Sequence, residues 1–433
     1  MLIQYSYFNI RYSNINRMKL SSFPIKERGT KCPFVRLLDM KKKERMKIYT
    51  LLLGALIACP MQAQTMHDWE NHHVLQINRE PARAAFTPFS VQKGDGSISL
   101  DGTWKFRWTP VPNERVMNFY QTNFNDKDWT DFPVPANWEV NGYGTPIYVS
   151  AGYPFKIDPP RVMGEPKTDY TTYKERNPVG QYRRTFVLPT GWEVNGQTFL
   201  RFEGVMSAFY VWINGKRVGY SQGSMEPSEF NVTKYLKSGE NQISLEVYRY
   251  SDGSYLEDQD FWRFGGIHRS IHLIHTPDIH VRDYAVRTLP ASAGDYEDFI
   301  LQIDPQFSVY RGMTGKGYVL QGVLKDASGK EVATLKGDVE DMLDLEHKAS
   351  RMNEWYPQRG PRKMGRLSAI IKSPERWTAE TPYLYKLHLT LQNGEGKVVE
   401  QIEQAVGFRS VEIKKGQLLV NGNPVRFRGV NRH

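Results

Sequence analysis

Cysteine is nearly absent from this sequence. The 433 residues hold only two, Cys32 and Cys59, and both fall within the first 60 positions. The rest of the chain therefore has no disulfide and no cysteine metal site, so its stability must come from hydrophobic cores. Helical heptads, a P-loop and a dinucleotide fingerprint are also missing, which removes the usual sequence signals of coiled coils and nucleotide-binding folds.

Excess charge is missing from most of the chain as well. The formal net charge is +10, but residues 1–64 hold 12 Lys and Arg against 3 Asp and Glu, while the remainder holds 45 against 44. The basic character belongs to the first segment, so the main argument for a nucleic-acid partner disappears and none is expected.

That first segment has no apolar run long enough for a membrane-spanning helix of about 20 residues. A charged stretch (Lys41–Lys47) precedes the short apolar run Ile48–Ala58, which is the pattern of a secretory signal. We therefore expect residues 1–64 to be a leader of a periplasmic or secreted protein, with residues 1–45 as an upstream extension if Met46 is the true start. Two processing routes stay open: cleavage after Ala63, or a lipid anchor at Cys59.

Short segments of alternating apolar and polar residues begin at Ser97, and turn residues separate them. Asn214-Gly215 lies between two apolar runs. Both central residues of a type I′ turn need positive φ, so this pair predicts a hairpin. The spacing of the segments predicts an antiparallel jelly roll over residues 65–278. A second alternating group follows Pro277-Asp278 and predicts an immunoglobulin-like β-sandwich over residues 279–407.

The stretch Ser251–Arg269 (SDGSYLEDQDFWRFGGIHR) concentrates charge and aromatic rings. Glu257, Asp258 and Asp260 fall within four positions and precede Phe261 and Trp262. If the stretch is extended, Asp258 and Asp260 share one face about 6.5 Å apart and repel by roughly 2.5 kcal/mol at an effective dielectric near 20. A sheltered version needs a cation, an arginine or hydroxyl donors. Two interpretations remain: a solvated acidic loop, or a sugar-binding site.

Several blocks of the sequence together resemble one family. They are DWENHHVLQINREP, VPANWEVNGYGTPIY, VGYSQGSMEPSEFNVT, the EDQDFWR stretch, WTAETPYLY and VNGNPVRFRGVNRH. In this order they are similar to the large bacterial β-galactosidases of glycoside hydrolase family 2. The resemblance covers nearly everything from Asp68 onward.

The resemblance implies an all-β chain: a jelly-roll sugar-binding sandwich, an immunoglobulin-like sandwich, and residues 408–433 as the start of a truncated (β/α)8 barrel. Its only barrel strand would be Arg426–His433. Such a barrel needs roughly 250 residues, so we expect it to be absent here. The family hydrolyses terminal β-galactosides by a retaining mechanism. No catalytic residue carries over, so this chain alone should be inactive, although the full-length protein would be an enzyme.

The family also implies supporting residues in this chain. Asp260, His433 and Ser150 would contact the sugar; Ser150 stands where many relatives have Asn. Asp260 would also help to hold a sodium ion. A structural magnesium would take oxygen ligands from Asp68, Asn71, the Val74 carbonyl, Gln222 and Asp252. A galactoside would be the substrate, and the full-length protein would be a homo-oligomer.

Two alternatives stay open at this point. One keeps the family but changes the sugar, which gives a β-glucuronidase or a β-mannosidase. The other is a non-catalytic carbohydrate-binding protein built from two sandwiches.

Overall fold

The computed structural model describes residues 67–84, 96–192, 194–294, 296–344 and 366–431. The leader with Cys32 and Cys59 lies outside these residues, and so does His433. Within the described residues, no helix has the length and apolar character needed to cross a membrane.

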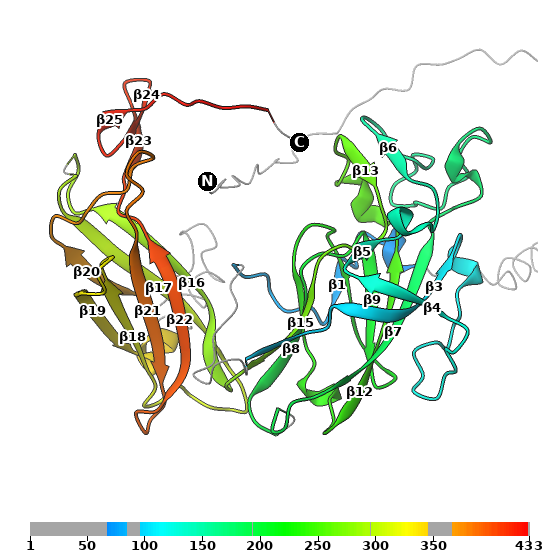
Figure 1. Ribbon diagram of the computed structural model, residues 1–433, viewed down its shortest axis with the longest axis horizontal. Helices are drawn as coiled ribbons and strands as arrows, with labels where there is room; N and C mark the ends of the chain where they lie inside the picture. Colours follow the sequence, from blue (N-terminus) through cyan, green and yellow to red (C-terminus); the bar gives the residue numbers. More distant parts are fainter. Residues whose placement is uncertain (1–66, 85–95, 193, 295, 345–365, 432–433) are drawn as a thin grey trace, which may run out of the picture. The chain divides into compact units, whose positions relative to one another are not determined.

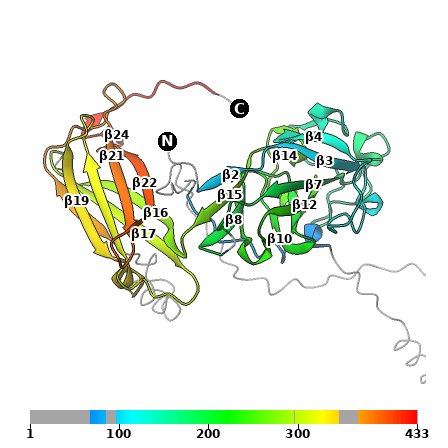
Figure 2. The ribbon, with the colours of Figure 1, turned by 60° about the horizontal axis from the view of Figure 1, so that its bottom comes forward.

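The first sandwich is built from two antiparallel sheets (Figures 1 and 2). The strands of its seven-stranded sheet are, in spatial order, β1 (Gln76–Ile77), β10 (Lys216–Gln222), β9 (Ala208–Ile213), β12 (Glu240–Tyr248), β7 (Val179–Val187), β3 (Gly102–Thr109) and β4 (Thr130–Val134). Those of the four-stranded sheet are β11 (Ser228–Asn231), β8 (Gln197–Phe202), β15 (Ile271–Thr276) and β2 (Ser97–Ser99).

Both faces of the larger sheet are buried, which explains why β9 reads as a continuous apolar run. Phe209, Val211 and Ile213 point into the core between the two sheets. The alternate residues Tyr210 and Trp212 point to the opposite face, where loops cover them in a second, aromatic cluster. The predicted hairpin between β9 and β10 is confirmed: Asn214 has φ 50° and Gly215 has φ 78°.

Two short ribbons extend this sandwich. β6 (Ile147–Val149) pairs with β13 (Phe261–Arg263), and β5 (Ala136–Asn137) pairs with β14 (Gly266–Ile267). Gly265 joins the two ribbons and lies against the indole of Trp138, where an added Cβ would approach the ring to 2.4 Å. Only glycine fits at this position, so the Gly-Gly pair after the acidic stretch has a packing reason.

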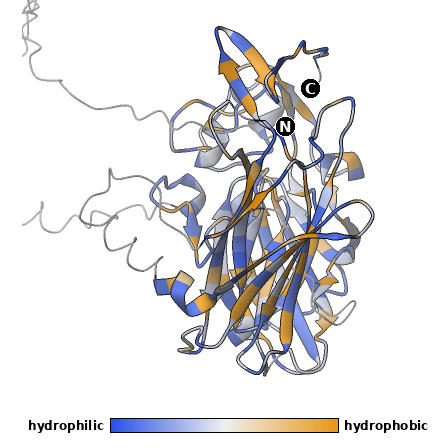
Figure 3. Cartoon of the chain, turned by 90° about the vertical axis from the view of Figure 1, so that its left-hand side faces the viewer, coloured by the Kyte–Doolittle hydropathy of each residue, from blue (hydrophilic) through white to orange (hydrophobic). Residues whose placement is uncertain are grey.

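The second sandwich also has two antiparallel sheets. One contains β16 (Ile279–Pro290), β17 (Phe299–Val309) and β20 (Leu367–Ile371); the other contains β19 (Glu331–Asp338), β18 (Val319–Lys325), β21 (Tyr385–Gln392) and β22 (Val398–Val406). Figure 3 shows apolar and polar residues alternating along its strands. The inward residues form a core of their own. The expected all-β fold with a jelly roll and an immunoglobulin-like sandwich is therefore confirmed; the α-helical residues in the described part of the chain are 339–344, beside several short 3-10 helices.

The last described segment differs from expectation. A small sheet of β23 (Val411–Lys414), β24 (Gln417–Val420) and β25 (Asn423–Pro424) forms around an Asn421-Gly422 turn. The predicted strand Arg426–His433 is wrong for its described residues, because 426–431 have no strand structure. A strand needs a neighbour for its backbone groups, and the described residues supply none here. Phe427 and Val430 are accordingly 79% and 92% exposed.

Candidate functional site

Strands β6 and β13 form a two-stranded ribbon next to two of the predicted sugar-contacting residues (Figure 1). Its antiparallel register pairs Tyr148 with Trp262 and Val149 with Phe261. Ser150 directly follows β6 and Asp260 directly precedes β13, so the antiparallel pairing brings both to the same end of the ribbon.

Asp260 is held by a neighbour that the sequence did not indicate. The phenol of Tyr148 donates a hydrogen bond to Asp260 Oδ1. Asp260 directly precedes β13, two positions before Trp262, which pairs with Tyr148, and a long side chain can reach across this distance. This hydrogen bond raises the pKa of Tyr148, because ionising the phenol would place a second negative charge beside the carboxylate.

Exposed aromatic rings lie beside this carboxylate. Tyr148 is 52% exposed and Trp262 is 47% exposed, and their rings meet edge to face with centroids 5.7 Å apart. Trp262 also stacks on Phe264. Rings next to a carboxylate suit a sugar, which has hydroxyl donors on its edges and apolar C–H faces. This arrangement favours the sugar-binding interpretation of the acidic stretch over a solvated loop.

The other two carboxylates of the stretch face different partners. Asp258 pairs with Arg263 at 2.5 Å, and Glu257 accepts hydrogen bonds from the Ser224 amide and hydroxyl at 2.7 and 2.6 Å. The extended arrangement with Asp258 and Asp260 on one face is not formed. A tight turn, closed by the Phe261 amide and the Gln259 carbonyl at 2.8 Å, precedes β13. The bend relieves the repulsion that an extended segment would have, and each carboxylate gains its own donor.

A buried ion pair anchors the base of the ribbon. Arg249 lies 3.2 Å from Glu139, and both side chains are 1% exposed. The Arg249 guanidinium also donates to the backbone carbonyls of Thr145, before β6, and Arg263, at the end of β13. Burial raises the pKa of Glu139, although Arg249 opposes this shift. One arginine thus connects both strands of the ribbon to the sandwich.

The predicted magnesium ligands lie on three segments that meet. The 3-10 helices η2 (Asp68–Glu70) and η7 (Asp252–Tyr255) are in contact. Gln222, at the end of β10, donates to Asp252 at 2.6 Å. Asp68 Oδ2 accepts hydrogen bonds from Tyr210 at 2.7 Å and Arg217 at 3.2 Å.

The residues present fit a hard cation. Asp252 is 8% exposed, and burial raises its pKa, so its carboxylate would gain from a positive partner. Among the described residues, no three His, Cys, Asp or Glu side chains gather into a metal site. A magnesium site here would therefore depend on neutral oxygens as well as carboxylates. Asn71, Gln222 and the Val74 carbonyl would supply them, and hard cations accept such ligands.

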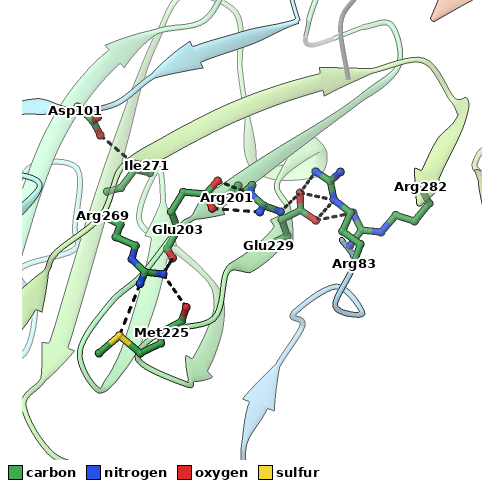
Figure 4. A network of polar contacts seen from close by, with 9 residues as sticks. All are labelled: Arg83, Asp101, Arg201, Glu203, Met225, Glu229, Arg269, Ile271 and Arg282. Carbon is green, nitrogen blue, oxygen red and sulfur yellow. Dashed lines mark hydrogen bonds and ion pairs between the residues drawn. The ribbon is translucent and has the colours of Figure 1, made fainter. Parts of the chain in front are cut away.

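A second buried ion cluster lies outside this region (Figure 4). Glu229, on β11, is bound by Arg83 at 2.6 Å and by Arg282 at 2.6 Å, and Arg201 is 3.6 Å away. These arginines lower the pKa of Glu229 to about 2 despite its burial. The cluster connects the segment before Ala84 and strand β16 to the smaller sheet, which is a structural role.

Sequence reasoning proposed Asp260 and Ser150 as sugar contacts, and this stays a prediction. It placed Trp262 in the acidic stretch but did not identify Tyr148, which donates to Asp260, or the anchor Arg249. The alternation of residues before Ser150 could have indicated that Tyr148 lies on a strand. It could not have indicated that this strand pairs with β13. His433 lies outside the described residues, so its predicted sugar contact stays a prediction.

Comparison with known proteins adds an independent finding. The model of the glycosyl hydrolases family 2 sugar binding domain matches residues 98–277, and a second family 2 model matches residues 279–409. Over 84% of its length the chain is 38% identical to a β-galactosidase of Priestia megaterium and 36% identical to one of Pectobacterium atrosepticum. It spans about a third of the length of these curated relatives, 34% and 33%.

Solved structures agree on the fold. A β-glucuronidase from Bacteroides uniformis matches 78% of this chain and 35% of its own length with a TM-score of 0.57, at 23% identity. A β-glucuronidase from Ruminococcus gnavus in complex with D-glucuronic acid matches 81% of this chain and 52% of its own length with a TM-score of 0.53, at 18% identity. At such identities the likeness concerns the fold and not the substrate.

Proposed function

Because this chain belongs to glycoside hydrolase family 2, we propose that it is part of a β-galactosidase that hydrolyses terminal β-D-galactosides with retention of configuration. The identity of 36–38% to bacterial β-galactosidases, over 84% of the chain, carries the choice of galactose. The ribbon geometry supports a sugar site, because Asp260 and the exposed rings of Tyr148 and Trp262 lie together and Ser150 follows β6 at the same end of the ribbon.

In this proposal the ribbon holds the sugar and does not break the bond. Tyr148 occupies one oxygen of Asp260. The other oxygen is then available to a sugar hydroxyl or to a sodium ion, which would bring a sugar oxygen close to the carboxylate. Ser150 would add one hydroxyl contact from the opposite strand. The rings of Tyr148 and Trp262 would pack against the C–H face of the ligand.

Magnesium would have a structural role. Held by Asp68, Asn71, Gln222, Asp252 and the Val74 carbonyl, it would neutralise the buried carboxylate of Asp252 and connect η2 to η7. Retaining hydrolysis itself needs an acid and a nucleophilic carboxylate about 5 to 5.5 Å apart. None of the residues matched to the family supplies that pair. We therefore expect the 433-residue chain by itself to bind galactosides weakly and to hydrolyse none.

The proposal is tested by Asp260→Asn in the enzyme expressed from its whole gene. The substitution keeps the shape and removes the charge, and a hydrogen bond to a charged group contributes about 1.5 to 3 kcal/mol. Turnover of a nitrophenyl β-galactoside should fall at least about tenfold, with weaker dependence on sodium. Asp131→Asn is the matched control, since Asp131 forms only an exposed ion pair with Lys105.

The substrate is tested with the same preparation. Wild-type enzyme is assayed on nitrophenyl β-galactoside, β-glucuronide and β-mannoside. Preference for the glucuronide or the mannoside would refute the choice of sugar and keep the family. Unchanged kinetics in Asp260→Asn would remove this residue from the site. Turnover by the 433-residue chain, purified from a host without its own galactosidase, would show that the sandwiches contain a catalytic pair.

A further inference from the structure

A cavity of about 330 Å³ lies on the outer face of the seven-stranded sheet. It shares no lining residue with the β6–β13 ribbon. Its floor comes from alternate residues of two neighbouring strands, Tyr210 and Trp212 of β9 and Glu246 and Tyr248 of β12, which point away from the core between the sheets. Arg115 and Arg217 are part of its wall.

The cavity is rich in hydrogen-bond donors that the protein does not use. Arg217 lies over the Tyr210 ring, with its guanidinium carbon 4.6 Å from the ring centroid, and its side chain is 47% exposed. A guanidinium has five N–H donors. Within the described residues, Arg217 donates only to Asp68. The indole N–H of Trp69, another lining residue, is buried and has no acceptor in the described part of the chain.

Acceptors in the cavity are largely occupied. Glu246 is 6% exposed, and its Oε1 accepts the Tyr248 hydroxyl at 2.5 Å while its Oε2 accepts the Gln181 amide at 2.8 Å. Arg115 lies 3.4 Å from the same carboxylate. Asp68 Oδ2 already receives hydrogen bonds from Tyr210 and Arg217. The carboxylates that line the cavity therefore orient its arginines and tyrosines, and a ligand would find donors rather than acceptors.

The chemistry of the lining selects a class of ligand. The exposed ring of His67 and the partly exposed ring of Tyr120, which both line the cavity, suit a ligand ring with apolar C–H surface. A half-exposed guanidinium with free N–H groups suits a planar carboxylate, which it can bind through two parallel hydrogen bonds. The volume lies at the lower end of the range for small-molecule sites, about 300 to 1,000 Å³. We propose that this cavity binds a uronic acid residue of an acidic saccharide, with the carboxylate on Arg217.

Such a site would be separate from galactoside hydrolysis. It would retain an acidic saccharide on the sandwich while the ribbon contacts a terminal galactose. The proposal does not depend on the proposed hydrolase activity, because the residues that carry it belong to the described part of this chain.

Binding to the 433-residue chain tests the proposal. Methyl galacturonide and methyl galactoside differ only in having a carboxylate or a hydroxymethyl group at C5, and acetate supplies a carboxylate without the ring. Titration calorimetry and saturation-transfer NMR should show methyl galacturonide binding at least about tenfold more tightly than methyl galactoside, which lacks the charged, bidentate contact, and more tightly than acetate, which lacks the sugar ring.

Variants locate the site. Arg217→Gln should lower the affinity for methyl galacturonide at least about tenfold. Arg217→Lys keeps the charge beside Asp68 but loses the planar guanidinium. This variant should fold normally, and its affinity for methyl galacturonide should still fall several-fold. Lys216→Gln removes one positive charge at the exposed neighbouring position and should leave the affinity for methyl galacturonide unchanged. Asp260→Asn should also leave the affinity unchanged, which separates this site from the galactoside site.

Three results would overturn the proposal. Methyl galactoside could bind as tightly as methyl galacturonide, which would show that the carboxylate is not recognised. Affinity for methyl galacturonide could be unchanged in both Arg217 variants, or it could be lost in Asp260→Asn. The last result would place the acidic sugar at the ribbon.

Discussion

Glu400 is a buried carboxyl group whose ionisation should weaken the second sandwich. It lies on β22 and is 2% exposed. One oxygen accepts a hydrogen bond from the Val281 amide at 2.8 Å, while the other has no partner within the described residues. Burial raises the pKa of Glu400 to about 8. The neutral acid is therefore the form that the folded chain prefers.

The sign of the pH dependence follows from this shift. A pKa raised from 4.5 to about 8 means that the folded chain holds a proton that the unfolded chain has released. Stability from this group is fully present below about pH 4.5 and is lost as the pH rises through 8. At 1.36 kcal/mol for each unit of pKa shift, the free energy of unfolding falls by about 5 kcal/mol over the whole titration. About 3 kcal/mol of this loss falls between pH 5.5 and 8.5.

Glu400→Gln removes the titration and keeps the size of the side chain. The carboxamide oxygen can still accept from the Val281 amide. Denaturant unfolding at pH 5.5 and 8.5 should show that the wild type loses about 3 kcal/mol more than the variant over this interval. Hydrogen exchange of the amides in β22 reports opening of this sandwich separately from the other.

Glu395→Gln serves as the control, because Glu395 is an exposed glutamate in the turn between β21 and β22. It should leave the wild-type pH dependence intact. If Glu400→Gln and the wild type lose stability in parallel as the pH rises, then Glu400 is already ionised in the folded chain. The reasoning from its burial would then be wrong.

Further changes should act through other contacts. Glu229→Gln would leave Arg83, Arg201 and Arg282 without their shared carboxylate. It should lower the free energy of unfolding, measured with denaturant, by about 3 to 5 kcal/mol. Because the pKa of Glu229 is lowered to about 2, the wild type should lose this stabilisation as the pH falls from 4.5 towards 2. Gly265→Ala should cost about 1 to 3 kcal/mol by overpacking against Trp138, whereas Gly429→Ala, with open space around it, should be neutral. A chelator should lower the unfolding temperature of the wild type and not that of Asp252→Ala, if a divalent cation binds at η2 and η7.

The fold was predictable from the sequence because local signals specify it. Alternation shows which residues face a core, and Asn214-Gly215 shows where the chain reverses. The strand expected over Arg426–His433, which residues 426–431 do not form, shows the limit of such signals. A strand needs a neighbour, and a segment of sequence carries no information about whether one is present.

The site was only partly predictable for the same reason. Asp260 and Ser150 were identified through resemblance, but their proximity depends on the register of a three-residue ribbon whose strands are more than 100 residues apart. The Tyr148 contact follows only once that register is known. The tight turn at Gln259 separated Asp258 from Asp260, although the sequence alone equally allowed an extended segment.

The ribbon also explains why a charged pair is buried beneath it. A two-stranded ribbon is only marginally stable by itself, and in the proposed function Asp260 at its end would need a fixed position to bind a ligand. Arg249 donates to backbone carbonyls next to both strands, and Glu139 accepts the amide of Gly265 at the far end of β13. Burying this ion pair costs solvation that hydrophobic residues would not lose. Apolar side chains of the same size could fill the space, but they could not bind these backbone groups, so we infer that the pair is retained to orient the ribbon.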